Sequence, residues 1–191
     1  MSTDPRPPRA DAARNREQLL AVATRVFASD GAEASMRAIA REAGVGIATL
    51  YRHFPTRQAL VEAVYRDQVE RLTTGARTLL AEHTPAEAMR RWMDLYGEWI
   101  ATKSGMLDTL LAMVESGDLA HTRTRDSILA AISAILDAGV AAGELRPDVT
   151  AVEVSASLIG IFTVIRQADG AVRADRLLEI LLDGLRPRRS S

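Results

Sequence analysis

The sequence contains no cysteine in its 191 residues. A chain without thiols cannot form disulfides, hold a thiolate zinc site or use a cysteine nucleophile. Histidine is almost as rare: it occurs at His53, His83 and His121, which are too scattered for a metal site. No spacing typical of a nucleophile with its base is present either. We therefore expect no metal and no cofactor, and we do not expect an enzyme.

Long hydrophobic runs are also missing. The longest is VTAVEVSASLIGIFTVI (149–165), which Glu153 interrupts and which falls short of the roughly 20 apolar residues that cross a bilayer. The first residues, MSTDPRPPRADAARN, lack the apolar core of a secretory signal. We interpret 149–165 as a buried or interface helix, and we expect a cytoplasmic protein with no membrane partner.

A strong excess of charge of one sign is absent as well, because the formal net charge is −1. The average conceals an asymmetry. Residues 1–57 carry 9 arginines against 6 acidic residues, a balance of +3, whereas residues 58–191 carry 15 basic against 19 acidic residues, a balance of −4. A basic front and an acidic remainder indicate two parts with different partners. With 47% hydrophobic residues, the chain can form one or two compact domains with a core.

What is present is helical periodicity throughout, with apolar residues spaced at three and four positions. We predict an all-α fold of about nine helices. Their expected ranges are 12–29, 36–43, 46–54, 57–80, 85–101, 106–116, 119–142, 149–167 and 171–184. Asp11, Ser35 and Thr56 are suited to cap the first, second and fourth of these helices, and the KSG triplet at 103–105 is expected to end the fifth.

Two of the shortest predicted helices, 36–43 and 46–54, are joined by the tight turn AGVG (43–46). Gly44 allows the backbone to reverse, and Val45 can fill the corner between the helices. This is the pattern of a helix-turn-helix, in which the second helix enters the major groove of DNA. Taken alone, the pattern also fits other helical hairpins.

A series of spaced motifs makes the pattern specific. The segment RVFASDGAEASMRAIAREAGVGIATLYRHFPTRQALVEAVY (25–65) combines F-x-x-x-G, S-M-R-x-I-A, A-G-V, T-L-Y-R-H-F and P-T-R-x-A-L in this order. It resembles the N-terminal domain of TetR/AcrR-family transcriptional regulators, and the remaining two thirds of the chain resemble the SbtR-like subgroup in architecture. The resemblance implies an N-terminal three-helix helix-turn-helix domain and a C-terminal helical bundle domain. The expected organisation is a flexible arm (1–10), a DNA-binding domain (11–56), an effector-binding and dimerisation domain (57–185) that starts with a linking helix (57–80), and a tail (186–191).

The resemblance also implies which side chains meet DNA. Thr49, Tyr51 and His53 would hold the phosphate backbone. Arg37 and Arg52 have the reach for guanine edges or phosphate. The complete predicted set is Arg37, Gly46, Ile47, Ala48, Thr49, Tyr51, Arg52, His53 and, as a further phosphate contact at the start of the fourth helix, Arg57. A solvated surface without DNA contact is the alternative for the polar members of this set.

The start of the third helix departs from the usual pattern of the family. Gly46, Ile47 and Ala48 stand where base reading normally occurs, and the middle position, often polar or basic in relatives, is apolar in this chain. Periodicity allows Ile47 to be buried with Leu50 and Phe54, whereas the resemblance favours exposure to DNA. Our hypothesis is that Ile47 and Ala48 contact thymine methyl groups, while the arginines supply the polar part of the reading.

A stripe of aromatic residues marks the larger C-terminal part. Trp92, Tyr96 and Trp99 lie at i, i+4 and i+7 of a predicted helix. By the resemblance, this region binds a small organic effector of apolar or amphipathic character. The predicted pocket consists of Trp92, Tyr96, Trp99, Met106, Leu110, Met113 and Phe162. A plain hydrophobic core without a cavity explains the same residues equally well.

The last two predicted helices are apolar over much of their surface. By the resemblance, they pair with those of a second copy in a four-helix bundle, which makes the protein a homodimer. The predicted interface consists of Ala151, Ser155, Leu158, Phe162, Leu178, Leu181 and Leu182. A dimer also suits the twofold symmetry of a palindromic operator on double-stranded DNA.

These observations predict a ligand-responsive, DNA-binding transcriptional regulator, a repressor that a small effector releases from its operator. Two other classes compete with this interpretation. An enzyme is disfavoured, because the chain lacks the residue spacing of a catalytic nucleophile or a metal site. A helical ligand-binding or protein-interaction module without DNA binding is favoured only by the apolar start of the third helix.

Overall fold

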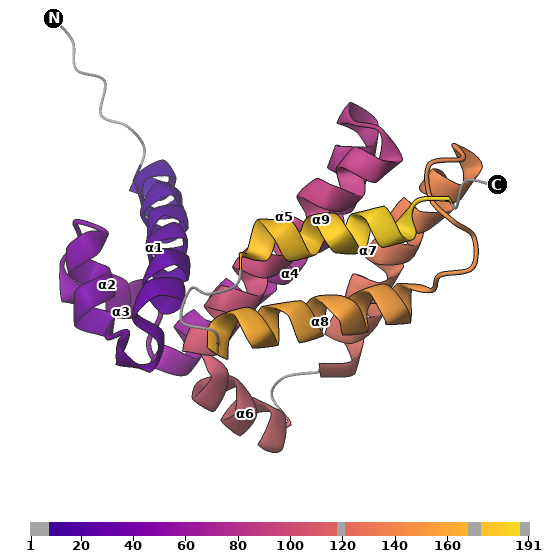
Figure 1. Ribbon diagram of the computed structural model, residues 1–191. Helices are drawn as coiled ribbons and strands as arrows, with labels where there is room; N and C mark the ends of the chain where they lie inside the picture. The colour runs from indigo at the N-terminus through magenta and orange to yellow at the C-terminus, as the bar shows by residue number, and fades with distance from the viewer. Residues whose placement is uncertain (1–7, 118–120, 168–172, 188–191) are drawn as a thin grey trace, which may run out of the picture. The chain divides into compact units, whose positions relative to one another are not determined.

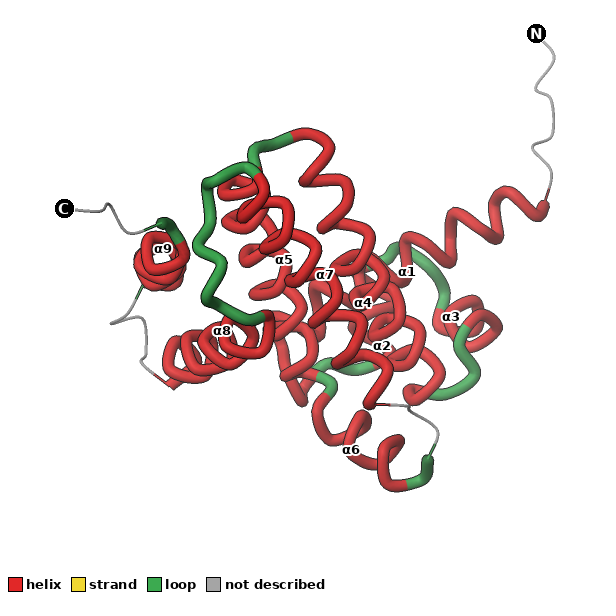
Figure 2. Tube along the Cα trace, turned by 90° about the vertical axis from the view of Figure 1, so that its right-hand side faces the viewer, coloured by secondary structure: helices red, strands yellow, loops and turns green. Residues whose placement is uncertain are grey.

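The computed structural model describes residues 8–117, 121–167 and 173–187, and within these ranges the chain is all-α, as predicted, with no strand. Figures 1 and 2 show the helices. Their bounds are α1 Pro8–Asp30, α2 Met36–Glu42, α3 Ile47–His53, α4 Arg57–Glu82, α5 Pro85–Gly105, α6 Leu107–Glu115, α7 His121–Ala141, α8 Ala151–Gln167 and α9 Ala174–Leu185, with a 3₁₀ turn at Gly31–Glu33. In these ranges no helix combines the length and the apolar character needed to cross a membrane.

The chain forms two compact units. The first unit combines Met1–Asp67 with Ala101–Leu119, and the second combines Gln68–Ile100 with Ala120–Ser191. Helices α4 and α5 therefore each contribute one end to the first unit and the rest to the second. The boundary between the two units falls within α4, after Asp67. The reason is that Leu60, Val61 and Val64, in the first turns of this helix, are buried in the first unit. The functional boundary at residue 57 stays a prediction.

Two of the three predicted helix caps are confirmed. The Ser35 hydroxyl accepts a hydrogen bond from the Ala38 N–H at 3.1 Å, and the Thr56 hydroxyl accepts one from the Ala59 N–H at 3.0 Å. The cap predicted at Asp11 is wrong, because α1 already begins at Pro8. Proline suits a first helical turn, where its missing N–H would have no partner in any case. Residues 8–10 of the predicted arm are thus helical, and residues 1–7 lie outside the described residues.

The break predicted at residues 103–105 is also wrong, since α5 continues to Gly105. Gly105 is the last residue of α5, and its missing side chain serves close packing. A Cβ atom at this position would lie 1.9 Å from the backbone oxygen of Phe27 in α1. The end of α5 can therefore approach the backbone of α1 only because residue 105 has no side chain.

Candidate nucleic-acid interface

The turn between α2 and α3 closes with two backbone hydrogen bonds. The Gly44 N–H donates to the Arg41 carbonyl at 3.1 Å, and the Val45 N–H donates to the Ala40 carbonyl at 3.0 Å. Gly44 has φ 66°, in the left-handed region that a side chain makes costly. Val45 is half-buried at the corner. The chain thus reverses where the sequence predicted, through a glycine-dependent helix end.

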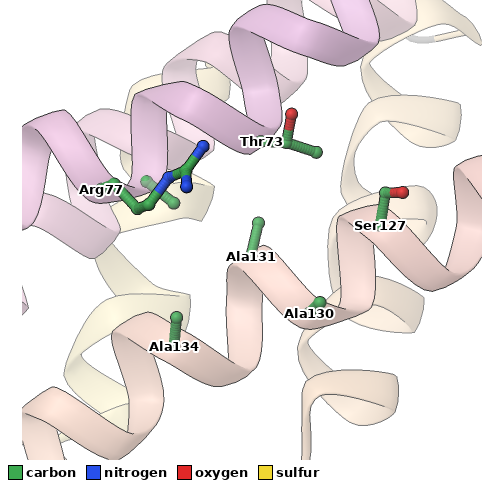
Figure 3. Close-up of a pocket in the computed structure, with 7 residues that line it drawn as sticks. Thr73, Arg77, Ser127, Ala130, Ala131 and Ala134 are labelled. Carbon is green, nitrogen blue, oxygen red and sulfur yellow. The ribbon is translucent and has the colours of Figure 1, made fainter.

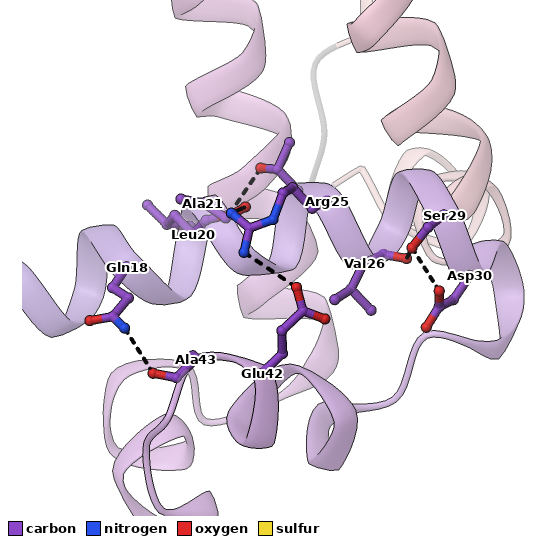
Figure 4. A network of polar contacts seen from close by, with 10 residues as sticks. Gln18, Leu20, Ala21, Arg25, Val26, Ser29, Asp30, Glu42 and Ala43 are labelled. Atoms are coloured by element: carbon purple, nitrogen blue, oxygen red, sulfur yellow. Dashed lines mark hydrogen bonds and ion pairs between the residues drawn. The ribbon is translucent and has the colours of Figure 1, made fainter.

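Helix α1 holds this hairpin through side chains that the sequence analysis did not single out (Figure 4). The Gln18 amide donates to the Ala43 carbonyl at 2.9 Å, which satisfies a carbonyl at the end of α2. The guanidinium of Arg25 lies 3.3 Å from the carboxylate of Glu42. Because this ion pair is exposed, the amide contact is the more informative of the two for positioning.

Helix α3 buries one face and exposes the other. Leu50 and Phe54 are buried, as predicted, whereas Ile47 is 38% exposed and therefore is not a core residue. The remaining predicted contacts on this segment are accessible: Gly46, Ala48, Tyr51 and Arg52 are exposed, and Thr49 and His53 are half-buried. The structure thus brings the predicted side chains of α3 together on one accessible surface.

Two arginines add positive charge to this region. Arg37 on α2 and Arg52 on α3 are both exposed. Neither forms an ion pair with another residue in the part of the chain that the structure describes. Their charges are therefore available to an external anion. Guanidinium groups suit phosphate oxygens and guanine edges, because their planar fork can donate two parallel hydrogen bonds.

Arg57 differs from these two arginines. It is half-buried, and its Nη1 donates a hydrogen bond to the Ala34 carbonyl. Its guanidinium carbon also lies 5.2 Å from the centre of the Phe27 ring. A second cation–π contact places the guanidinium of Arg16 5.3 Å from the centre of the Phe54 ring. The contact of Arg57 with DNA phosphate stays a prediction.

The aromatic stripe of α5 is packed inside the second unit. Tyr96 lies with its ring centre 5.6 Å from that of Trp92 and 5.2 Å from that of Trp99. The Trp92 indole N–H donates to the Leu72 carbonyl at 2.9 Å. Burial raises the pKa of Tyr96, while a hydrogen bond with Ser155 acts in the opposite direction.

The remaining residues of the predicted pocket fall in both units. Phe162 lies with its ring centre 6.2 Å from that of Tyr96 in the second unit. Met106, Leu110 and Met113 are buried within the first unit. The aromatic residues and the three residues Met106, Leu110 and Met113 thus belong to separate compact units. Their joint role in one effector pocket stays a prediction.

A groove of about 290 Å³ lies between α4 and α7 in the second unit (Figure 3). Alanines form most of its walls, and two hydroxyl groups and a guanidinium complete it. The lining residues are Thr73, Ala76, Arg77, Ser127, Ala130, Ala131 and Ala134. Arg77 is exposed, and no ion pair joins it to another described residue. Alanines in a helix indicate close packing and open space equally well, so this groove could not be predicted from the sequence.

The predicted dimer interface needs correction at three positions. Leu158, Leu178 and Leu182 are buried in the chain's own core, with Leu158 0% exposed, so they offer no surface to a second copy. The physical reason is that α8 packs against α7 and α9 (Figure 1), and that Leu158 of α8 and Leu178 and Leu182 of α9 are buried within this chain. Four predicted residues keep accessible surface, namely Ala151, Ser155, Phe162 and Leu181.

The exposed apolar side chains of α8 lie on the other side of the helix. Val152, Ile159 and Val164 are exposed, Ile159 at 51%, and Ala156 and Gly160 lie between them. Ile180 on α9 is exposed as well. The five residues Val152, Ala156, Ile159, Gly160 and Val164 are called the α8 apolar face. The sequence signal for it was present, but Leu158 and Ile159 are equally apolar, and periodicity alone did not separate them.

Comparison with known proteins agrees with this geometry. Residues 19–64 match the family profile "Bacterial regulatory proteins, tetR family", and residues 84–187 match "Transcriptional regulator SbtR-like, C-terminal domain". Among curated proteins, the HTH-type transcriptional regulator SAB2452 of Staphylococcus aureus is 30% identical over 112 residues, 58% of this chain and 58% of that protein. The chain thus matches less than two thirds of the length of such curated relatives.

Solved structures resemble the chain over more of its length. The TetR transcriptional regulator SCO0520 from Streptomyces coelicolor has 46% identity and a TM-score of 0.81, with 90% of this chain and 98% of that chain covered. The TetR transcription regulatory protein from Mycobacterium vanbaalenii has 38% identity and a TM-score of 0.73, with 95% and 100% covered. Sequence and fold therefore point to the same group of proteins.

Proposed function

We propose, from the premise that this chain belongs to the TetR family of bacterial transcriptional regulators, that it binds a palindromic operator as a homodimer and that a small molecule releases it. Members of the family are DNA-binding regulators and not enzymes. The observation that carries the proposal is the accessible surface of α3, held in place by the glycine turn after α2 and by Gln18 of α1.

The accessible residues of α3 suit distinct parts of a DNA duplex. Thr49, Tyr51 and His53 end in groups that hydrogen-bond phosphate oxygens, which position a protein on DNA. Ile47, with a 38% exposed side chain at the start of the helix, suits the methyl group of thymine in the major groove. Arg52 is charged, exposed and without an ion pair among the described residues, so it suits a guanine edge or a phosphate.

The α8 apolar face supports the proposal of a dimer. Exposed isoleucine and valine side chains on one helix, with small residues between them, permit close approach of a second copy. A twofold dimer places two recognition helices about 34–36 Å apart, one turn of DNA, or a multiple of that distance. A palindromic operator follows from this symmetry. Repression by occupying the operator is the proposed outcome.

The proposed ligand response rests on linkage. If a ligand and DNA favour different conformations of the dimer, each weakens binding of the other by the same factor. Helix α4 is the natural connection, because its residues up to Asp67 belong to the first unit and those from Gln68 to the second. The groove beside Thr73 and Arg77 offers an apolar or amphipathic molecule contact with α4, and the aromatic stripe of α5 is the site predicted from sequence.

Operator binding can be tested by selecting a site from a randomised palindromic library and measuring affinity by fluorescence anisotropy at several salt concentrations. Each phosphate that the protein neutralises adds about 0.9 to the slope of log K against log salt. Arg52→Met should lower this slope or relax base preference. Arg125→Met, which removes an exposed arginine of α7 in the second unit, is the matched control and should change neither. Failure to recover any site, or binding without salt dependence, would refute the proposal.

A further inference from the structure

The first turn of α4 is tied to the start of α2 through one side chain. Arg57 donates from Nη1 to the carbonyl of Ala34, and its guanidinium carbon lies 5.2 Å from the centre of the Phe27 ring. Ala34 directly precedes Ser35, the residue that caps α2. The guanidinium group of Arg57 thus connects three parts of the first unit: α4, α1 and the residue directly before the cap of α2.

The loss of this contact is costly because both partners of Arg57 are buried. Ala34 and Phe27 are both buried, and a buried carbonyl without a donor is costly. No other described hydrogen bond to the Ala34 oxygen is present. The guanidinium lies over the Phe27 ring and donates a hydrogen bond to the carbonyl at the same time. A lysine ammonium, which is a compact point charge without the fixed fork of donors, does not reproduce a ring contact and a directed hydrogen bond from one planar group.

The end of α5 also packs against the backbone of Phe27. A Cβ atom at Gly105 would lie 1.9 Å from the Phe27 backbone oxygen, so the two backbones are in direct contact. The first turn of α4 and the last turn of α5 thus meet at the same residue of α1. Both helices continue into the second unit. Phe27 and Arg57 therefore stand where either helix would transmit a displacement to the helix-turn-helix.

We propose that Arg57 is a positioning residue for DNA binding: it sets α2 and α3 relative to α4 through Ala34 and Phe27, and its charge is used inside the protein and not on a phosphate. This inference rests on the proposed function for its DNA readout alone. It reassigns a side chain that the family resemblance places on the duplex. Arg37 and Arg52, which form no such contact with any described residue, remain the proposed phosphate or base contacts.

Substitutions at Arg57 separate the two roles, because salt dependence counts phosphate contacts whereas geometry does not depend on charge alone. Arg57→Lys and Arg57→Met should both weaken operator binding by roughly tenfold, the order of magnitude expected from an unpaired buried carbonyl. Both should keep the wild-type salt slope. Arg52→Met calibrates the assay by showing the change in slope when a DNA-facing charge is lost.

The opposite result would overturn the proposal. If Arg57→Lys binds like the wild type and Arg57→Met lowers the slope by about 0.9, the guanidinium acts as a phosphate contact. Phe27→Leu provides a second variant, since it removes the ring while leaving the charge of Arg57. It should also weaken binding without a change in slope, and unchanged affinity in this variant would count against the proposal.

A measurement without DNA separates this proposal from the failure of the proposed function. Hydrogen exchange of the α2 amides, including the Ala38 N–H that Ser35 caps, should become faster in Arg57→Lys and Arg57→Met than in the wild type. Exchange in α6, which belongs to the same unit as α2, serves as the internal control and should stay unchanged, which shows that the first unit of each variant is folded. Unaltered exchange in α2 would remove the positioning role even if the wild type binds an operator.

Discussion

At the scale of single residues, Gly44 combines a positive φ of 66° with open space around its Cα, because a Cβ built there meets no atom within 4 Å. Any cost of a side chain is therefore a backbone cost. Gly44→Ala should destabilise the first unit by about 1–2 kcal/mol, the penalty of the left-handed region. Urea unfolding measures this. The same change at Gly184, which lies inside α9 with equal space but ordinary φ, should leave stability unchanged or raise it by up to about 1 kcal/mol.

Ile47 permits a second prediction at this scale. If its 38% exposed side chain meets a thymine methyl group, Ile47→Ala should relax base preference at one position of each half-site. The salt slope should not change, because no charge is removed. Binding to a library randomised at one base pair at a time measures the preference. Tyr51→Phe is the contrasting variant, since losing a phosphate contact should weaken all sites alike, and an unaltered preference in Ile47→Ala would contradict the hypothesis.

Local signals explain why some residues were predictable and others were not. Ser35 and Thr56 are capping residue types directly before a helix, and their partners lie three positions later, so the sequence contains the whole interaction. Arg57 is different, because its partners Ala34 and Phe27 are distant in sequence and ordinary in type. Such a contact exists only once three elements have packed together.

At the scale of elements, Gly105 shows that a glycine in a sequence can indicate either a helix end or a close approach of two backbones. The sequence predicts that the helix stops near residue 101, before this glycine, yet Gly105 is still helical, as the last residue of α5, and lies against the Phe27 backbone. Gly105→Ala should destabilise the first unit by about 1–3 kcal/mol, because backbone atoms cannot move aside as a side chain does. Urea unfolding checks this. Gly97→Ala is the comparison: the added Cβ would meet the Phe162 ring at 2.6 Å, and a side chain can shift, so the cost should be smaller.

Helix α8 shows the limit of periodicity for an element that is apolar nearly all round. Leu158 and Ile159 are neighbours of equal hydrophobicity, but the first is 0% and the second 51% exposed. Which side turns inward depends on the fit to α7 and α9, and the sequence of α8 alone does not contain that information. In α3, by contrast, the polar side is clear from the sequence, and Tyr51 and Arg52 are exposed as that pattern predicts.

This difference between neighbours allows a matched pair of variants. Ile159→Arg should disrupt the proposed dimer at micromolar concentration while preserving helix content, because the charge is placed on the α8 apolar face. Leu158→Arg buries the same charge inside the chain and should prevent folding. Sedimentation velocity and circular dichroism measure the two outcomes. If Ile159→Arg sediments like the wild type, this face is not the dimer interface.

At the scale of the whole molecule, the sequence predicted two parts but not which segments of the chain each compact unit combines, and the reason is physical. The first unit takes in residues 101–119 from the middle of the chain as well as residues up to Asp67. That grouping depends on contacts such as Gly105 with Phe27, which are far apart in sequence. The motifs of α2 and α3, in contrast, are local, and they led to the same family as the profile matches.

The symmetry of a dimer on DNA gives the last prediction. A pair of recognition helices held in one rigid dimer fits half-sites at a single separation, and half a helical turn of extra DNA rotates one half-site to the opposite side of the duplex. Inserting about 5 bp, half of the roughly 10.5 bp repeat, between the half-sites of the selected operator should therefore weaken wild-type binding by 100-fold or more, towards the non-specific level. Ile159→Arg is the control, because a monomer binds one half-site and should bind both operators equally weakly. Equal wild-type affinity for the two operators, measured by anisotropy at one fixed salt concentration, would show that the half-sites are bound independently and that no dimer bridges them.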